Sequence, residues 1–308
     1  MTTDGSALGA IGSTPLIKLQ KLPDSAMAEV WVKFEGANPS GSMKDRMALA
    51  MIEGAERRGQ LRPGGRVVEY TGGSTGTSLA FVCAAKGYRA HLVTSDAFSL
   101  EKRRMMKAYG AEVEEVPSEG GRITPDLVPR MIARATELAA EPDTYFTDQF
   151  NNADNPFAYR KLAEEVVEAI GVPDAFVAAA GTGGCFSGTA TYLKERSSSV
   201  ECVAVEPAAS RNLSGGELGA HRLEGIGVGF LPPRMRMDLA DRIEAASDEE
   251  SFECARRLGA EEGILGGITS GTNVVAALRV ARRLGPGNRV VTVIVDTGLK
   301  YLAGDLYS

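Results

Sequence analysis

Short runs of β-branched and apolar residues alternate with helical patterns along most of this sequence. Apolar runs typical of strands include residues 66–70 (RVVEY), 175–180 (AFVAAA) and 201–206 (ECVAVE). Several are apolar throughout, as expected for strands that are buried on both faces of a sheet. Helical patterns such as residues 99–110 (SLEKRRMMKAYG) separate them. This alternation predicts an α/β fold with parallel sheets covered by helices. The other predicted strands are residues 29–35, 90–94, 112–116, 144–148 and 289–296.

The length of the chain predicts two domains. At 308 residues it exceeds the size at which a single hydrophobic core usually stops growing. Because the strand–helix series restarts near residue 145, we expect a smaller domain over residues 36–145. The larger domain would comprise residues 1–35 and 146–308. Each is expected to hold an open, mostly parallel sheet flanked by helices.

Composition and charge favour a small-molecule role. The net charge is -6 and no block of basic residues occurs, which argues against nucleic acid or an anionic membrane as a partner. The N-terminal residues lack a leader pattern and no stretch is apolar enough to span a bilayer, so we expect a cytoplasmic protein. Four widely spaced cysteines without a C-x-x-C pair are expected to be reduced. Two histidines and no H-E-x-x-H motif argue against a metal site.

Residues 38–50 (NPSGSMKDRMALA) place one lysine at the start of an apolar helix. Ser42 and Asp45 fit a capping pattern, so a helix is expected to begin at Ser42 with Lys44 in its first turn. There the positive end of the helix dipole opposes an ammonium. In a dry site it favours the neutral, nucleophilic amine with which lysines form Schiff bases. Taken alone, this stretch leaves open the commoner alternative, a solvated surface lysine.

Two glycine-rich loops each follow a predicted strand and open a predicted helix. They are residues 71–76 (TGGSTG) and residues 181–188 (GTGGCFSG). Glycines let the backbone turn sharply and aim several N–H groups at one point, and a helix N-terminus adds a field that favours an anion. Each loop is therefore a candidate cradle for a phosphate or carboxylate. The alternative is a strand-to-helix turn that uses glycine for its geometry alone.

Two familiar motifs compete for these loops. A dinucleotide fingerprint, G-x-G-x-x-G, would need glycine where Phe186 stands. Residues 72–76 fit G-x-S-x-G, the nucleophile elbow of serine hydrolases, with Ser74 as the nucleophile. That mechanism needs an acid and then a histidine downstream, whereas the last histidine, His221, is followed by a strand and at least two helices. The hydrolase alternative also leaves Lys44 and the second loop without a role.

A third stretch, residues 266–278 (GGITSGTNVVAAL), places Thr269 and Ser270 before a predicted helix. The commoner explanation is a helix cap. The functional alternative is a hydroxyl that faces a neutral ring nitrogen.

Taken together, these stretches resemble the cysteine synthase (O-acetylserine sulfhydrylase) branch of the fold type II pyridoxal-phosphate enzymes, which includes cystathionine β-synthase. A lysine in N-P-x-G-S-x-K-D-R is a specific signal of that family. The resemblance implies a tryptophan synthase β-like fold, pyridoxal 5'-phosphate as cofactor, a small amino-acid substrate and a homodimer. It also raises a serine acetyltransferase-like protein as a partner. The similar stretches are residues 11–16 (IGSTPL), 38–46, 181–188, 213–230 (LSGGELGAHRLEGIGVGF) and 296–302 (DTGLKYL).

The family's roles can be carried over where residues match. Lys44 would be the Schiff-base lysine and the acid–base group at the substrate α-carbon. Thr269 would lie against the pyridine nitrogen of the cofactor, and Gly225 would line the mouth of the site. The cofactor phosphate would be held by the loop of Gly181, Thr182, Gly183, Gly184 and Cys185. The substrate carboxylate would be bound by Thr71, Gly72, Gly73, Ser74 and Thr75, with Gln149 as a second contact.

Three departures from the family pattern limit this comparison. The family's carboxylate loop reads T-S-G-N-T-G, whereas Gly72 and Ser74 here replace a hydroxyl and the amide that touches the cofactor's phenolic oxygen. Cys185 replaces a threonine at the end of the phosphate loop but keeps the backbone donors. Residues 157–166 (FAYRKLAEEV) lack the H-x-x-T-G-P-E run of cysteine synthases.

The resemblance implies a β-replacement, most simply O-acetylserine and sulfide giving cysteine and acetate. A lyase of the cysteine desulfhydrase or serine/threonine dehydratase type would differ only in whether water reaches the intermediate. From another class, the serine hydrolase alternative predicts a colourless protein that depends on Ser74 and not on Lys44. A non-catalytic binding relative would more naturally have lost the lysine.

Overall fold

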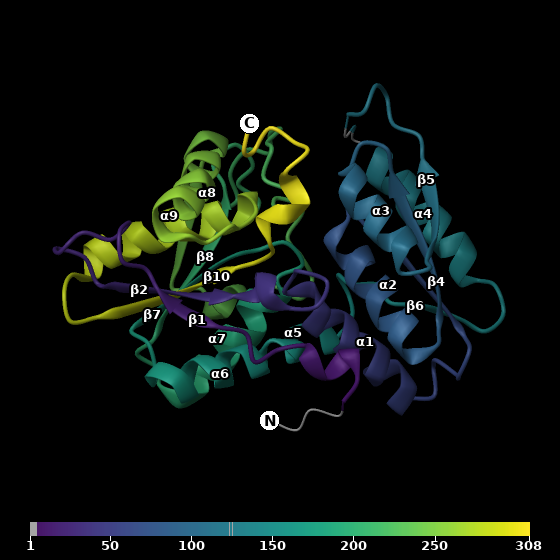
Figure 1. Ribbon diagram of the computed structural model, residues 1–308, viewed down its shortest axis with the longest axis horizontal. Helices are drawn as coiled ribbons and strands as arrows, with labels where there is room; N and C mark the ends of the chain where they lie inside the picture. The colour runs from purple at the N-terminus through teal and green to yellow at the C-terminus, as the bar shows by residue number, and fades with distance from the viewer. Residues whose placement is uncertain (1–4, 123, 125) are drawn as a thin grey trace. The chain divides into compact units, whose positions relative to one another are not determined.

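The computed structural model describes residues 5–122, 124 and 126–308, which form two compact units (Figure 1). The small unit comprises the described residues up to Ile11 together with Lys44–Asn155, and the large unit comprises Gly12–Met43 and Pro156–Ser308. Each unit holds one sheet flanked by helices, which confirms the predicted fold class. We keep the domain limits at residues 36 and 145 as a prediction. Residues 1–4, assigned there to the larger domain, lie outside the described residues.

The small unit contains a four-stranded parallel sheet in the order β5-β4-β3-β6. Helix α4 packs on one face, and α2 and α3 cover the other, with α1 against α2 (Figure 1). The core between α4 and the sheet includes Val68, Val93 and Met131. The bounds are β3 (Arg66–Tyr70), β4 (Arg89–Ser95), β5 (Glu112–Val116), β6 (Thr144–Phe146), α1 (Lys44–Arg57), α2 (Ser74–Lys86), α3 (Leu100–Ala108) and α4 (Leu127–Ala139), with the 3-10 helix η1 (Ala7–Ala10).

The large unit contains a six-stranded sheet in the order β1-β2-β10-β7-β8-β9. Its strands run parallel except β1, which pairs antiparallel with β2. Helices α8 and α9 lie on one side of the sheet, and α6 and α7 on the other (Figure 1). The strands are β1 (Leu16–Lys18), β2 (Glu29–Phe34), β7 (Ala175–Ala179), β8 (Glu201–Pro207), β9 (Arg242–Ala246) and β10 (Arg289–Ile294). The helices are α6 (Arg160–Ile170), α7 (Gly184–Arg196), α8 (Asp248–Glu262) and α9 (Ile268–Leu284), with the 3-10 helices η2 (Glu35–Ala37), η3 (Met237–Leu239) and η4 (Gly298–Tyr301). Helix α5 (Asp154–Ala158) contains the boundary between the units.

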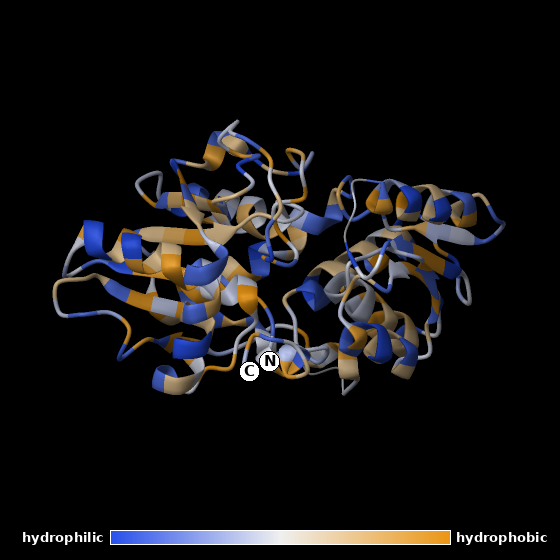
Figure 2. Ribbon diagram, turned by 90° about the horizontal axis from the view of Figure 1, so that it is seen from above, coloured by the Kyte–Doolittle hydropathy of each residue, from blue (hydrophilic) through white to orange (hydrophobic). Residues whose placement is uncertain are grey.

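The central strands of the large unit are apolar because both of their faces are covered. Every residue of β7 is buried, and Figure 2 shows hydrophobic colours along these strands and mixed colours along the helices. Two strands of this sheet, β1 and β9, were absent from the prediction. Both are edge strands, and Arg242 and Glu244 in β9 interrupt the apolar pattern that identifies a buried strand.

A buried ion pair ties β2 to α6. Lys33 is 2% exposed and its Nζ lies 2.7 Å from Glu165 Oε2, while it also donates to the carbonyl of Thr14. We expect Lys33→Met to lower the free energy of unfolding by about 3 kcal/mol, because the Glu165 carboxylate, whose side chain is 10% exposed, loses its ion pair with Lys33. Urea denaturation measures this. The control is Lys18→Met on β1, whose ion pair with Glu29 is exposed and should contribute less than about 1 kcal/mol. Equal losses in the two variants would contradict the assignment.

The four cysteines are buried and none forms a disulfide. Burial raises the pKa of the thiols of Cys83, Cys202 and Cys254 to about 12. The prediction of reduced core thiols is confirmed. Among the residues that the structure describes, no helix combines the length and the apolar character needed to cross a bilayer.

Candidate active site

The second glycine loop joins β7 to α7 in the large unit. The strand ends at Ala179, and α7 begins at Gly184. The first N–H groups of a helix have no acceptor within it, so the start of α7 offers backbone donors together with a favourable dipole field. The Thr182 hydroxyl accepts one of them, the Gly184 N–H, at 3.3 Å. This loop therefore has the local structure of an anion cradle.

Close packing requires glycine at two positions of this loop. A Cβ at Gly181 would lie less than 3.0 Å from the carbonyl oxygen of Gly225, a separation that real Cβ atoms essentially never show. Gly183 has a φ of 80°, and a Cβ there would lie 2.7 Å from the Cα of Met235. The loop is thus pressed against the segments around residues 225 and 235.

Three predicted site residues meet in the large unit. Thr269 is the second residue of α9, and its hydroxyl donates a hydrogen bond to the carbonyl of Glu224 at 2.6 Å. The next residue, Gly225, is the one that Gly181 approaches. The structure therefore connects the predicted phosphate loop, the predicted ring-nitrogen contact and Gly225 through residues 224–225.

The turn before Lys44 is fixed by the residues that follow β10. Met43 N donates to the carbonyl of Val295 at 2.8 Å, and Thr297 N donates to the carbonyl of Gly41 at 3.0 Å. Gly267 N, at the start of α9, donates to the carbonyl of Asp296 at 3.3 Å. The turn that leads to the lysine and the start of the Thr269 helix therefore belong to one hydrogen-bonded network.

Lys44 itself is the first residue of α1. The helix begins two residues later than the predicted start at Ser42, because the main chain of Ser42 pairs with Asp296 in an antiparallel bridge. The predicted place of Lys44 in the first helical turn is confirmed. Its side chain is half-buried, which differs from the fully solvated alternative.

In the small unit, the first glycine loop joins β3 to α2, and its threonine turns inward. The Thr71 hydroxyl accepts hydrogen bonds from Gly73 N at 2.9 Å and Gly76 N at 3.1 Å. Thr94 Oγ1 donates to the Thr71 carbonyl at 2.8 Å. Thr71 thus holds the loop in shape, and its predicted contact with substrate stays a prediction.

Two predicted substrate contacts that are far apart in sequence meet at this loop. Thr75 Oγ1 donates to Gln149 Oε1 at 2.7 Å, and Gln149 Nε2 donates to the carbonyl of Tyr70 at 3.2 Å. Both side chains are largely buried, with exposed fractions of 5% and 6%. The pair forms a fixed polar edge beside the loop.

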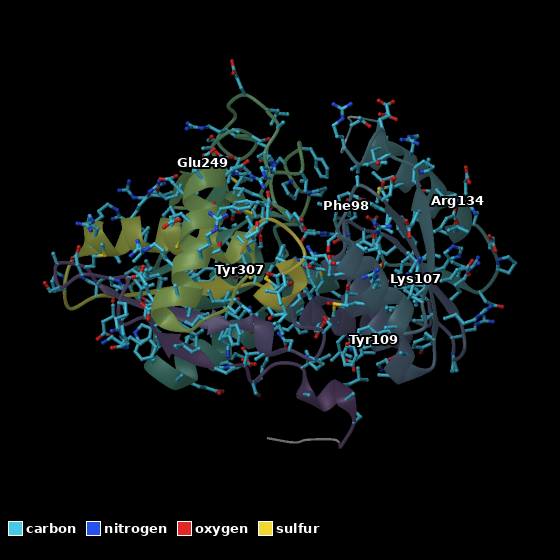
Figure 3. The ribbon with its side chains drawn as sticks, turned by 45° about the horizontal axis from the view of Figure 1, so that its top comes forward. Phe98, Lys107, Tyr109, Arg134, Glu249 and Tyr307 are labelled. Atoms are coloured by element: carbon cyan, nitrogen blue, oxygen red, sulfur yellow. The ribbon has the colours of Figure 1, made fainter. Side chains whose placement is uncertain are left out.

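The residues that depart from the family pattern lie at the accessible part of the loop. Gly72 is exposed, and Ser74 is a half-buried residue at the start of α2. A Cβ at Gly72 would lie 3.2 Å from the ring of Phe98, labelled in Figure 3. The aliphatic part of Lys102 fills the space beside Gly73. An apolar ring therefore stands where the family's hydroxyl would project.

The ring nitrogens of both histidines are engaged by groups other than Ser74. His91 Nε2 lies 3.3 Å from Glu114 Oε2, and its Nδ1 lies 3.5 Å from Glu112. His221 uses Nε2 for the carbonyl of Gly227 and Nδ1 for the N–H of Leu223. These are the two histidines of the chain. These contacts give the hydrolase alternative no support.

One buried carboxyl at the small-unit site was not predicted. Glu69, at the end of β3, is fully buried and accepts hydrogen bonds from Thr147 Oγ1, Gln149 N and Tyr70 N. Burial raises the pKa of Glu69 to about 8. The signal in the sequence was a single acidic residue inside the apolar run 66–70.

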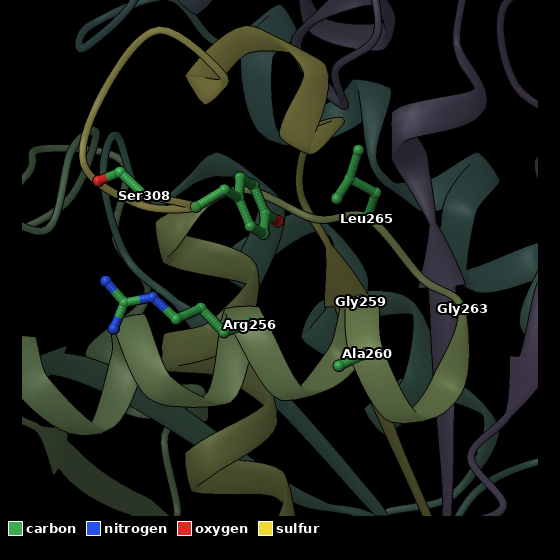
Figure 4. Close-up of a pocket in the computed structure, with 7 residues that line it drawn as sticks. Arg256, Gly259, Ala260, Gly263, Leu265 and Ser308 are labelled. Atoms are coloured by element: carbon green, nitrogen blue, oxygen red, sulfur yellow. The ribbon is translucent and has the colours of Figure 1, made fainter.

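An open hollow of about 400 Å³ lies elsewhere in the large unit (Figure 4). It is lined by α8, the following loop and the chain end, and contains none of the predicted site residues. Arg256 at its wall donates to the carbonyl of Leu306 at 2.7 Å. Within the described part of the chain, no group of three or more His, Cys, Asp or Glu side chains could hold a metal ion.

Comparisons with known proteins agree with the local geometry. Residues 7–296 match the family described as "Pyridoxal-phosphate dependent enzyme". A cysteine synthase of Staphylococcus aureus is 44% identical over 301 residues, which cover 97% of this chain and 95% of that protein. The O-acetylserine dependent cystathionine beta-synthase of Helicobacter pylori superposes with a TM-score of 0.92 at 38% identity, covering all of both chains. A hydrogen sulfide-producing enzyme of Fusobacterium nucleatum gives a TM-score of 0.90 at 38% identity, covering 96% of this chain and 99% of that one.

Proposed function

Because the chain belongs to the family of pyridoxal-phosphate dependent enzymes, we propose that it catalyses a β-replacement on an O-activated serine. The reaction would convert O-acetylserine and sulfide into cysteine and acetate. The supporting observation from the geometry is the network that links Gly181, Thr269 and the turn before Lys44. The 44% identity to a cysteine synthase over nearly the whole chain supports the choice of reaction.

The residues of the large unit fit the cofactor. Backbone donors at the start of α7 suit a phosphate, and the close packing at Gly181 and Gly183 keeps side chains out of the loop. The Thr269 hydroxyl suits an unprotonated ring nitrogen, to which it would donate in place of the Glu224 carbonyl. When bound, pyridoxal 5'-phosphate supplies the electron sink that makes the substrate α-proton acidic. The Cys185 thiol takes the place of a hydroxyl at the end of the cradle.

The chain's own residues perform the remaining tasks. Lys44 would hold the cofactor covalently, and as a general base its amine would take the substrate α-proton. The substrate carboxylate would be bound by Thr75, Gln149 and the backbone N–H groups of residues 72 and 74, which fix the α-carbon for that transfer. The Gly73 N–H instead donates to the Thr71 hydroxyl. Phe98 beside Gly72 contributes an apolar surface that limits access of water.

Elimination is the second candidate reaction, favoured by the 38% identity to a hydrogen sulfide-producing enzyme. It uses the same lysine and the same carboxylate contacts. The difference is whether water or the second nucleophile reaches the substrate after its β-substituent leaves. The serine hydrolase alternative has no support from the histidine contacts described above.

Incubating the cofactor-loaded protein with O-acetylserine and sulfide tests the proposal. We expect cysteine to form in an amount that depends on both reagents and exceeds pyruvate, because a β-replacement adds sulfide before water. Cysteine and pyruvate are quantified separately, and the visible spectrum is followed during addition of O-acetylserine, O-phosphoserine, serine or cysteine. Pyruvate formation that does not depend on sulfide would assign the elimination instead. A spectrum unchanged by all four amino acids would refute both reactions on these substrates.

We further propose a homodimer that works in the cytoplasm, on the family resemblance alone. A serine acetyltransferase-like protein is the partner that this resemblance suggests. Size-exclusion chromatography with light scattering, with and without such a partner, tests both assemblies.

A further inference from the structure

Glu69 is a fully buried carboxyl that holds the end of β3 to the chain segment after β6. Its Oε2 accepts from Thr147 Oγ1 at 2.5 Å and from Gln149 N at 3.0 Å. Its Oε1 accepts from Tyr70 N at 3.1 Å. An acidic side chain is rarely buried unless its hydrogen bonds are satisfied, and here three donors converge on one carboxyl.

These contacts fix the residue that carries the predicted carboxylate contact. The backbone of Gln149 is held at its N–H by Glu69 and at its carbonyl by Asn155 Nδ2, which donates at 2.7 Å. The side chain of Gln149 then reaches Thr75 Oγ1 and the Tyr70 carbonyl. The position of the Gln149 amide relative to the loop therefore depends on Glu69.

We propose that Glu69 is a positioning residue for substrate binding: it holds Gln149 in place, and Gln149 in turn orients the Thr75 hydroxyl toward the bound amino acid's carboxylate. This inference rests on the proposed function of the loop. In the structure the Thr75 hydroxyl donates its hydrogen to Gln149 Oε1. Binding of a carboxylate turns that hydrogen to the substrate, while the Gln149 amide stays in place through its backbone bonds and the Tyr70 carbonyl.

The protonation state of Glu69 decides which variant is conservative. Burial raises its pKa to about 8, and the charged or titratable groups that act on it are Asp148 and Tyr70. The raised pKa favours the protonated, uncharged carboxyl near neutral pH. Thr147 Oγ1, which donates to Glu69 Oε2, also lies 3.3 Å from the Val68 carbonyl oxygen. A glutamine side chain is the closest uncharged mimic, whereas leucine removes every acceptor.

The experiment compares Glu69→Leu with Glu69→Gln in the cofactor-loaded enzyme. Because Glu69→Leu leaves buried N–H groups unpaired, we expect the KM for O-acetylserine to rise about tenfold or more, with the KM for sulfide and the affinity for cofactor within about twofold. Glu69→Gln should restore the KM to within about threefold of the wild type. The Kd for the amino acid is obtained independently from its effect on the visible spectrum.

Glu206 provides a matched control in the other unit. It is also buried near the end of a parallel strand and accepts two backbone N–H groups and one hydroxyl, from Leu213 and Ser214. Glu206→Leu removes the same kinds of bonds, and we expect the KM for O-acetylserine to change less than about twofold. If Glu206→Leu raised the KM for O-acetylserine as much as Glu69→Leu does, general destabilisation would explain both results and the inference would be wrong.

A milder pair of variants keeps the test valid if Glu69→Leu does not fold. Thr147→Val removes one of the three donors, and Thr147→Ser keeps it. We expect the valine variant alone to raise the KM for O-acetylserine severalfold. If the wild-type spectrum responds to an amino acid and neither Glu69→Leu nor Thr147→Val weakens that response, the inference is wrong. If the wild-type spectrum responds to none, the proposed function is what fails.

Discussion

Replacing Lys44 by alanine is expected to lower kcat by at least about 1000-fold, because this variant loses the general base at the substrate α-carbon. The same substitution should remove the visible absorption band of the bound cofactor, since the covalent anchor is gone. Lys44 lies in the first turn of α1, directly after a turn that hydrogen bonds fix to residues 295–297. A visible spectrum and a cysteine-forming assay of the purified variant measure the two effects.

Two controls make this result specific. Lys44→Arg keeps a cation but cannot act as a base, so it should be as inactive as Lys44→Ala. Lys107→Ala removes an exposed lysine of α3, labelled in Figure 3, and should change neither band nor rate. Retention of both the band and the activity in Lys44→Ala would refute the assignment of the lysine.

Gly181→Ala is expected to weaken cofactor binding by roughly 5- to 140-fold. The new Cβ would meet the Gly225 carbonyl, and relieving that overlap must move either the phosphate cradle or residues 224–225, on which Thr269 depends. Overpacking of this kind typically costs about 1–3 kcal/mol, and every 1.4 kcal/mol is tenfold in affinity. Titration of the cofactor-free protein with pyridoxal 5'-phosphate gives the Kd.

Gly259→Ala is the matched substitution outside the site. This glycine lies within α8, and among the described residues outside that helix the nearest atom to its new Cβ would be Leu265 Cδ1, at an ordinary 3.7 Å. We expect an unchanged cofactor Kd and a stability gain of up to about 1 kcal/mol from helix propensity. If Gly181→Ala also binds cofactor normally, the loop does not hold the phosphate.

The strand–helix order could be predicted because most strands are buried on both faces. Such strands form continuous apolar runs, and β7 with its five buried residues is the clearest case. The edge strands β1 and β9 were not predicted, because a strand at the edge of a sheet need not be apolar and can contain charged residues such as Arg242. The start of α1 was misplaced by two residues because a long-range bridge to Asp296 engages Ser42.

The site residues could be predicted where the backbone conformation or packing requires a particular residue. They could be predicted less well where a side chain has several possible hydrogen-bond partners. Gly181 and Gly183 are recognisable because close packing and a left-handed φ exclude other residues. By contrast, the sequence offered no means to decide that the Thr71 hydroxyl turns into the loop or that Thr75 pairs with Gln149, 74 residues away. Glu69 was missed because two of its three hydrogen-bond donors, Thr147 and Gln149, come from a distant segment.

Burial makes the protein's own cysteine thiols unreactive toward the sulfur compounds that it is proposed to bind. Thiol–disulfide exchange proceeds through an accessible thiolate. Cys83, Cys202 and Cys254 are shielded from solvent, and their raised pKa keeps them protonated at neutral pH. Thiols buried in this way are poorly placed to exchange with the disulfide of cystine, the oxidised form of the proposed product.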